Sequence, residues 1–536
     1  MTWNFRIQRR IKSLPPSALA ILALLVLWIV ANGYFGWRYF PFRDDWSWFG
    51  RPNVLPAGPW GYFRVYQLYA YRPVSFFLDV MLWSRFWPSL TPVSVLFTLL
   101  VFVTAVIYRM ALSRITGQPM WSVMLVMLWW PLIVEGQYWL AAAGGDVLAL
   151  LALGLWMWMA TVLTESPHTR WLGWLGATLI LTLGNLSYEQ QWFITLLAAG
   201  LLSTLRTSHW RVISASAVSS LGIAAAWYLS NMAGLSANGK HANHSIGAVW
   251  LSLKDTIRQL WHMLGQSQWH AWVQAVTTPG RLPPPYWVVV LGLTVLAMWA
   301  IARTYPTAMT SGIAMWPLLA IGVLWIGLAY APWLLTHYHW IADRSVYAAS
   351  PGIGLIIEAL TLTIRQGVHH ILARRGLWAA ATTGLALLVG LHTQDIHAYQ
   401  VTGQFDQKVA RLTLKQMMAA HLPPSAPVLI RSSTLTVVPW DYPYHDHVAT
   451  SWGVAWGPRL MWEDLSHYRF HPHVTLLYPG QAVPSTHFTY QVVLIRGRPA
   501  KAQCAPGTFP CMAIQYHDQW PRPRVTRWKI FTGPRS

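Results

Sequence analysis

The chain has 536 residues, of which 54% are hydrophobic and only 10% are charged, whereas soluble globular proteins carry roughly 25% charged residues. The basic residues outnumber the acidic ones, with 38 Lys and Arg against 17 Asp and Glu, and the formal net charge is +21. This composition excludes a soluble enzyme and a disordered tail protein. It also argues against nucleic-acid binding, because the basic residues are spread among long apolar runs.

Residues 1–397 predict a bundle of membrane helices. A membrane-spanning helix needs about 20 mostly apolar residues, and about 11 runs meet that requirement. The predicted spans are 17–36, 92–113, 119–135, 138–163, 171–187, 190–205, 212–232, 286–302, 312–335, 346–364 and 376–394. The runs 119–135 and 138–163 are either two spans or one kinked unit, and the sequence leaves both interpretations open. The first run follows a basic stretch and resembles a signal peptide, but its length predicts a retained anchor.

The distribution of arginines predicts the orientation. Cytoplasmic loops are enriched in Lys and Arg, and placing the N-terminus in the cytoplasm puts most short-loop arginines on that side. An odd number of spans then leaves the C-terminal part outside. We expect an integral, multi-pass protein of a bacterial inner membrane, with outer loops at 37–91 and 233–285. For the second loop, an amphipathic helix lying on the membrane and a re-entrant lid both stay open.

Residues 398–536 predict a periplasmic, soluble α+β domain. Apolar residues recur at helical spacing until residue 422, where a Pro-Pro pair predicts the helix end. Short β-like runs follow at 426–433, 474–480, 490–497 and 512–518. The only two cysteines, Cys504 and Cys511, favour a disulfide in an oxidising compartment, and two unpaired thiols are the alternative.

Acidic residues gather on the predicted outer face. Nine of the eleven carboxylates in residues 1–397 fall on or near it in this topology. Carboxylates are costly in an apolar membrane and usually mark a site. The alternative is that each one caps a helix or pairs with a nearby Arg. The sequence therefore predicts an acidic, water-accessible site formed by Asp44, Asp45, Glu135, Asp146, Glu189 and Asp343.

Asp44 and Asp45 are adjacent in the segment RYFPFRDDWSWF, after the first span. Two adjacent like charges repel, so either a cation neutralises the pair or one carboxyl takes a raised pKa. A raised pKa is what a general base needs near neutral pH. A turn that caps an interfacial helix is the alternative interpretation.

The order of motifs along the chain carries a family resemblance. The acidic pair is followed by YRPVSFFLDVMLW (71–83), PLIVEGQYWLAAAGGDVLALLAL (131–153), LSYEQQW (186–192) and ADRSVYAASPGIGL (342–355). Over residues 1–365 this series resembles the polytopic GT-C glycosyltransferases, particularly the protein O-mannosyltransferase-like and TMTC-like branches. The chain departs from that pattern where Tyr188 replaces a Lys and where AAAGGD lacks an Arg.

The resemblance implies an inverting transfer of a sugar from a polyprenyl phosphate at the outer face of the membrane. It implies that Asp44 or Asp45 is the general base and that Arg72 and Arg344 hold the donor phosphate, because Arg forks pair with phosphate oxygens. An ion pair with a loop acid is the alternative role for Arg72. Further candidates for the site are Glu135, Asp146, Glu189, His337, His339, Asp343 and Tyr347.

No cofactor is expected, and a divalent metal held by His337 and His339 near Asp343 is an open alternative. The expected partners are the lipid-linked sugar, the membrane lipids and an acceptor, which could be a protein, a lipid or a polysaccharide. Two other functions compete with the transferase. They are a transporter or flippase of a lipid-linked glycan and a non-catalytic membrane scaffold.

Overall fold

A computed structural model gives the fold of the chain. It describes residues 15–41, 44–65, 72–165, 170–231, 246–277, 282–305, 315–334, 345–367, 370–432, 450–453, 456–477, 488–496, 511–517 and 524–531. The chain divides into two compact units. The helical unit comprises Met1–Trp37, Leu68–Phe76 and Val95–Gln394, and the sheet unit comprises Arg38–Gln67, Phe77–Ser94 and Asp395–Ser536. The sheet unit thus combines most of the first predicted outer loop with the C-terminal part, and the predicted domain boundary at 397 stays a prediction.

Eight helices in the described part of the chain are long and apolar enough to cross a membrane, so the chain is a polytopic helical membrane protein. They are α2 (Pro16–Gly33), α6 (Thr91–Thr116), α9 (Leu140–Glu165), α12 (Trp210–Ser230), α16 (Pro284–Thr304), α17 (Met315–Leu334), α18 (Ser345–Gly367) and α19 (Ile371–Ala419). Each overlaps one of the predicted runs, but α19 continues well beyond the run 376–394 and also forms the helix that was predicted separately at the start of the C-terminal part.

The other three predicted runs form shorter helices, which corrects the expected number of full spans. They are α7 (Trp121–Trp129), α10 (Arg170–Asn185) and α11 (Gln191–Leu205). At 1.5 Å per residue these helices are about 14, 24 and 22 Å long, short of the ~30 Å hydrocarbon core. The shortest one, α7, stops before Pro131, and Leu132 follows in the left-handed region with φ 74°. A break of this kind is invisible to a hydropathy window.

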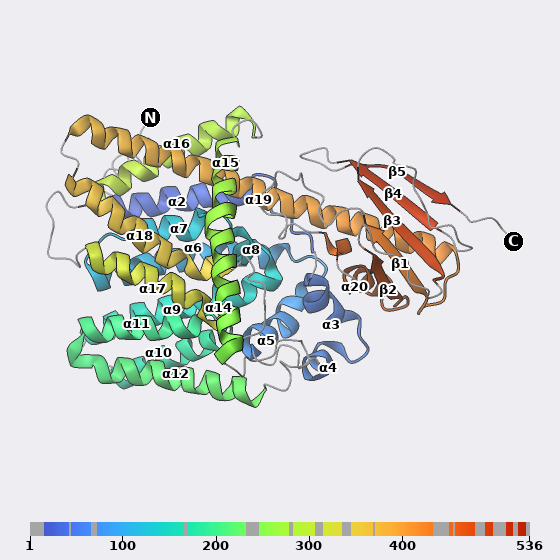
Figure 1. Ribbon diagram of the computed structural model, residues 1–536, viewed down its shortest axis with the longest axis horizontal. Helices are drawn as coiled ribbons and strands as arrows, with labels where there is room; N and C mark the ends of the chain where they lie inside the picture. The colour runs from blue at the N-terminus through green and yellow to red at the C-terminus, as the bar shows by residue number, and fades with distance from the viewer. Residues whose placement is uncertain are drawn as a thin grey trace, which may run out of the picture. The chain divides into compact units, whose positions relative to one another are not determined.

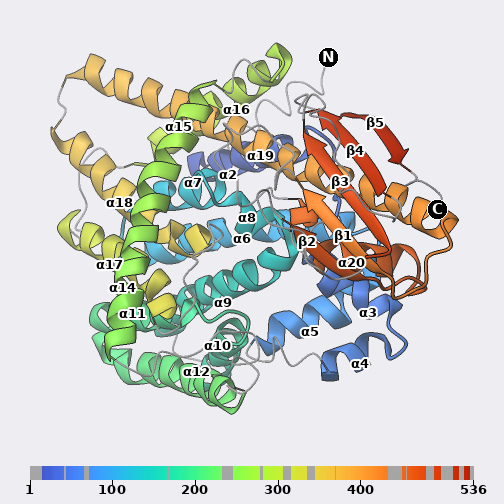
Figure 2. The ribbon, with the colours of Figure 1, turned by 45° about the vertical axis from the view of Figure 1, so that its right-hand side comes forward.

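The helical unit also contains several shorter elements. They are the start of α5 (Pro73–Met81), α8 (Val134–Tyr138), η4 (Thr207–His209), α14 (Ile246–Trp261), η5 (His262–Ser267) and α15 (Gln268–Thr277). Figure 1 and Figure 2 both show α14, η5 and α15 as one rod that runs across the neighbouring spans. The rod buries Ala271 and Ala275 against Leu391 and leaves Trp250, Trp261 and Trp269 exposed. This pattern fits the amphipathic-helix alternative for the second outer loop.

Buried polar side chains of the helical unit find partners across helices. The indole of Trp156 in α9 donates to the Ser216 hydroxyl in α12 at 3.0 Å. Glu358 lies fully buried in α18 and accepts hydrogen bonds from the Ser122 amide at 2.9 Å and the Tyr305 hydroxyl at 2.8 Å. Burying a carboxylate is costly unless it is hydrogen-bonded, so these donors explain how α18 carries an acid.

The sheet unit is built on a five-stranded sheet with strand order β2-β1-β3-β4-β5. The strands are β1 (Pro427–Ser432), β2 (His473–Leu477), β3 (Tyr490–Arg496), β4 (Cys511–His517) and β5 (Arg524–Phe531). The first four are parallel and match the predicted runs, whereas β5 pairs antiparallel with β4. The sequence analysis missed β5 because basic residues interrupt its apolar pattern, and such charges are common on edge strands.

Short helices and the end of α19 complete the sheet unit. The short helices are η1 (Trp46–Gly50), α3 (Arg51–Val54), α4 (Gly58–Val65), η3 (Trp83–Phe86), η7 (Ser451–Gly453) and α20 (Trp456–Leu465). The long helix α19 ends at Ala419, and His421 follows with φ 52° before the Pro-Pro pair. The predicted end of this helix is therefore confirmed.

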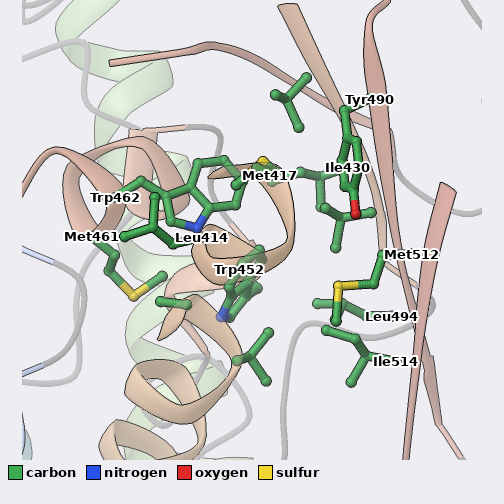
Figure 3. Packing of buried hydrophobic residues seen from close by; sticks show 14 of the residues in the cluster. Leu414, Met417, Ile430, Trp452, Met461, Trp462, Tyr490, Leu494, Met512 and Ile514 are labelled. Atoms are coloured by element: carbon green, nitrogen blue, oxygen red, sulfur yellow. The ribbon is translucent and has the colours of Figure 1, made fainter. Parts of the chain in front are cut away.

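One hydrophobic core holds the sheet unit together. Figure 3 shows Leu414 and Met417 of α19 beside Trp452 and Trp462, facing the side chains of the strands. Trp46, from the segment 37–91 that was predicted to be an outer loop, is 2% exposed and belongs to the same core. Burial of an aromatic side chain is worth several kcal/mol, so this core attaches that segment to the C-terminal sheet.

Replacing Trp462 tests this core. The residue is fully buried, and its indole donates to the Thr413 hydroxyl at 2.9 Å. We expect Trp462→Ala to destabilise the sheet unit by about 3–5 kcal/mol, because it leaves a large cavity. Proteolysis of the purified full chain during a thermal ramp measures the loss. Trp456→Ala changes a 40% exposed residue of the same helix and should cost much less; equal losses would contradict the assigned core.

Candidate functional site

Two of the sequence motifs meet in the helical unit through an ion pair. Arg72, just before α5, donates from Nε to Oε2 of Glu189 at 2.6 Å and from Nη2 to Oε1 at 2.5 Å. The same guanidinium lies 4.0 Å from the ring centre of Tyr188. A forked Arg–carboxylate contact fixes both position and orientation. The YRP and LSYEQQ motifs therefore meet in one cluster. Arg72 forms an ion pair with an acid of a turn, as the alternative interpretation of this residue had predicted.

The turn that carries Glu189 is held by hydrogen bonds from both sides. Asn185 ends α10, and its side-chain amide donates to the Ser220 hydroxyl of α12 at 2.8 Å. The Trp192 indole of α11 donates to the Asn185 carbonyl at 2.8 Å. On the other side, the Ser75 hydroxyl of α5 donates to the Ser187 carbonyl at 3.0 Å. The last two contacts satisfy backbone carbonyls at and just beyond the end of α10, and all three together hold the turn in place.

Two further motifs join this cluster. A β-carbon at position 145 would lie 3.1 Å from Cδ2 of Tyr188, which is a tight contact, so the glycine of the AAAGGD motif brings α9 close to the turn. The next residue, Asp146, is 2% exposed and interacts electrostatically with Tyr347 at the start of α18. The hydroxyl of Tyr347 has no hydrogen-bond partner among the described residues. Four motifs spread from 72 to 347 therefore converge.

Glu135 belongs to the same end of the helical unit. It lies in α8, is 1% exposed, and α8 packs against α9 and α18. Among the described residues of this cluster, Arg72 and Glu189 are the ones whose side chains remain partly exposed, at 12% and 22%. An incoming ligand would therefore meet this ion pair before the buried acids.

The acidic pair lies in the sheet unit and divides into two environments. Asp44 is partly exposed, and its carbonyl accepts from the amides of Ser47 and Trp48 at 2.9 Å each, which starts η1. Asp45 is fully buried and accepts a hydrogen bond from the Tyr39 hydroxyl at 2.6 Å. The contrast follows from the next residue, because Trp46 is drawn into the core of the sheet unit.

Asp79, which the sequence analysis did not select, lies beside Asp45. It is 1% exposed, and neither carboxyl oxygen has a hydrogen-bond partner among the described residues. Burial raises the pKa of Asp79 well above its usual range, and the charge of Asp45 raises this pKa further. Asp406, equally buried in this unit, differs because it accepts three hydrogen bonds from Thr450 and Ser451. The signal available in the sequence was one acid in the apolar run VSFFLDVM.

A second acid with a raised pKa lies elsewhere in the sheet unit. Burial raises the pKa of Asp464 to about 7, and the hydrogen bond from the Trp87 indole, at 2.8 Å, lowers it in part. The neighbouring Glu463 is paired with Arg459 at 2.7 Å and Arg51 at 3.5 Å. The hydrogen bond from Trp87 connects Asp464 of α20 to the segment after η3. Nothing in the sequence indicated that Asp464 is buried.

Several predicted site residues lie outside the described residues. They are His337, His339, Asp343, Arg344 and Cys504. Cys511 is buried at the first residue of β4, and its pairing with Cys504 stays a prediction. In the part of the chain that the structure describes, no group of three or more His, Cys, Asp or Glu side chains is placed to hold a metal ion.

Asp79→Asn tests the buried acidic pair. The folded chain binds the Asp79 proton more tightly than the unfolded chain, so stability falls as pH rises above the unfolded pKa of about 3.9. The variant removes this loss, and we expect its melting temperature to exceed that of the unmutated chain at pH 8 and to approach it near pH 4.

Asp406→Asn is the matched control, because it breaks accepted hydrogen bonds and should lower the melting temperature at pH 8. Calorimetry or scanning fluorimetry of the purified protein reads both variants. Equal destabilisation at pH 8 by the two substitutions would show that Asp79 is not held as an unsatisfied acid.

Comparison with known proteins identifies no family, so any function must be argued from the cluster around Arg72 and Glu189 and from the buried acids Asp45 and Asp79. No protein-family model, no characterised protein and no solved structure matches the chain. The structure shows a polytopic helical membrane protein with eight candidate spans in its described part and a small, mostly parallel C-terminal sheet.

Proposed function

We propose that the chain is a membrane glycosyltransferase of the GT-C type. It moves a sugar from a polyprenyl phosphate to an acceptor at the outer face of the membrane, with inversion at the anomeric carbon. One observation carries the proposal: side chains of four separate motifs, Arg72, Asp146, Glu189 and Tyr347, converge at one end of the helical unit. Ionisable residues in an apolar membrane protein mark functional sites far more often than they stabilise it.

Arg72 is the proposed contact for the donor phosphate in the described part of the helical unit. Glu189 occupies the edge of the guanidinium formed by Nε and Nη2, so a phosphate would approach Nη1 or displace the carboxylate. Tyr188 stands where the GT-C pattern has a Lys, and Arg72 stacks on its ring at 4.0 Å. The Arg72 guanidinium thereby places a positive charge next to position 188, where the GT-C pattern would have the positive charge of a Lys. Arg344 remains the second proposed phosphate contact.

Asp44 is the proposed general base. The acceptor oxygen attacks the anomeric carbon while its proton passes to the Asp44 carboxylate, and the bond from the sugar to the phosphate oxygen breaks. Polyprenyl phosphate leaves with the electron pair and needs cations, not an acid, to stabilise it. Asp44 suits this role better than Asp45, because it is partly exposed whereas Asp45 is fully buried against Tyr39. Burial and the charge of Asp45 both raise the pKa of Asp79, which favours the neutral form of Asp79 beside Asp45.

The proposed location is a bacterial inner membrane, with the N-terminus in the cytoplasm and the C-terminal part in the periplasm. This orientation needs an odd number of crossings, so the proposal takes the short helices α7, α10 and α11 as crossings beside the eight long ones. Arginines mark one end of the spans in the helical unit, since Arg114, Arg303 and Arg365 lie in the last turns of α6, α16 and α18. Arg206 at the end of α11 pairs with Glu165 at the end of α9 at 2.8 Å. Such an arginine-rich end is typical of the cytoplasmic side.

Asp44→Asn tests the base. General-base help is worth roughly 10²–10⁴-fold in rate, so we expect transfer to fall by about that range while binding of the polyprenyl-phosphate sugar survives. Asp45→Asn is the control, because this residue is buried and should affect stability more than turnover. The assay uses the purified full chain with a panel of lipid-linked sugars and acceptors, and it reads binding and transfer separately. Full activity of the Asp44→Asn, Asp45→Asn double variant would end this mechanism.

The orientation has its own test. We expect a fluorescent protein inserted between residues 166 and 167 to fluoresce, and alkaline phosphatase fused after residue 536 to be active, because phosphatase activity needs the periplasm. The reciprocal pair of fusions should be silent and is the control. An inactive C-terminal phosphatase with a fluorescent reciprocal fusion would overturn the outer-face location of the reaction.

A further inference from the structure

A large groove lies at the opposite end of α18 from Tyr347. Its volume is about 830 Å³, and its walls come from α7, α16, α18 and α19, with Trp272 of α15. Apolar side chains such as Leu125, Val126, Ile357 and Leu385 form most of the wall. All of the lining residues belong to the helical unit, including those of α19, which lie between 374 and 388. The groove is therefore shaped for a hydrocarbon chain, and it is separate from the cluster formed by Arg72, Asp146, Glu189 and Tyr347.

Two arginines line one end of the groove. Arg374 of α19 donates from Nη2 to the backbone carbonyl of Arg365 of α18 at 3.2 Å. The two guanidinium groups are close enough to repel each other electrostatically. Two neighbouring positive charges at the mouth of an apolar groove favour an anionic group there.

Arginine–aromatic contacts at this end of the groove are of the kind typical of the membrane surface. Arg365 lies 4.6 Å from the ring centre of Tyr305, and Arg109 lies 3.6 Å from that of Trp121. Arg303 shows the same contact with a Trp in α16 at 3.8 Å and lines a smaller cleft of about 400 Å³ with Arg109. Such aromatic and basic side chains collect at the level of lipid headgroups. The arginines thus lie where a lipid phosphate would lie.

The length of the groove matches one lipid chain. Its α19 wall extends from Arg374 to Leu388, which is about 21 Å at 1.5 Å per residue. This length lies within a hydrocarbon core of about 30 Å. At the far end, the rings of Trp130 and Trp272 meet at 6.0 Å between centres. The groove therefore has a charged mouth, an apolar body and an aromatic end.

We propose that this groove binds an anionic glycerophospholipid of the membrane. Its phosphate lies between Arg365 and Arg374, and one acyl chain follows the α19 wall toward Trp272. Basic pockets between membrane helices on the cytoplasmic side are known to hold anionic headgroups, which is the chemistry that this mouth offers. The proposal does not depend on the transferase function.

The test uses the purified full chain, freed of lipid in detergent, and dioleoyl phosphatidylglycerol as the probe. Native mass spectrometry and thermal stabilisation measure binding, with dioleoyl phosphatidylcholine and inorganic phosphate as comparison ligands. We expect phosphatidylglycerol to be retained in preference to both. The Arg365→Gln, Arg374→Gln variant should bind it about 30-fold more weakly, since each arginine near anionic lipid contributes about a fivefold step.

Two position-matched controls separate the groove from general surface charge. Arg375→Gln makes the same charge change next to Arg374, at a residue that does not line the groove, and should weaken binding much less. Gly384 lines the groove, and a β-carbon there meets nothing within 4 Å, so Gly384→Phe should block the acyl chain without disturbing the helix. Gly376→Phe, at an equally open position of α19 outside the groove, should leave binding intact.

Three results would overturn the proposal. The first is unchanged affinity for phosphatidylglycerol in a folded Gly384→Phe variant. The second is an equal loss of binding in the Arg375→Gln control and the double arginine variant. The third is retention of polyprenyl phosphate in preference to phosphatidylglycerol, which would assign the groove to the isoprenoid carrier.

Discussion

The forked ion pair between Arg72 and Glu189 supports the geometry of the helical unit's polar end. The two residues are 117 positions apart in the chain, and their side chains are only 12% and 22% exposed. Removing either partner would leave a charge with little water, which is far more costly than losing an exposed pair. The position of Tyr188 beneath the guanidinium follows from this pair, and glycine at 145 lets α9 approach that ring.

The sheet unit solves a different electrostatic problem. Asp45 and Asp79 are both buried and close enough for the charge of one to disfavour ionisation of the other. The core around Trp46 holds Asp45 in this environment, whereas Asp44, one residue earlier, stays partly exposed. One core therefore supports two adjacent carboxyl groups with different chemistry. That division is the physical basis for choosing Asp44 as the proton acceptor.

The sequence predicted what local pattern encodes. The spans α2, α6, α9 and α16, the end of α19 and the first four strands follow from hydropathy, Pro-Pro and β-like runs. It did not predict that Trp46 is buried in a core shared with α19 and α20. An aromatic residue just after a span is equally consistent with the aromatic belt at a membrane interface. Asp79 was missed for a related reason: its importance comes from a neighbour distant in sequence, not from its own motif. An ion pair between Arg72 and a loop acid was predicted only as one of two alternatives, and Glu189 was not named as the partner.

The central claim is that this polar end transfers a sugar from a lipid phosphate. The most direct measurement is release of polyprenyl phosphate from a polyprenyl-phosphate sugar by the purified full chain, with the anomeric configuration of the product read by NMR. The account predicts acceptor-dependent release and a product inverted relative to the donor. Tight binding of the donor with no release on any acceptor, or a product with retained configuration, would contradict it.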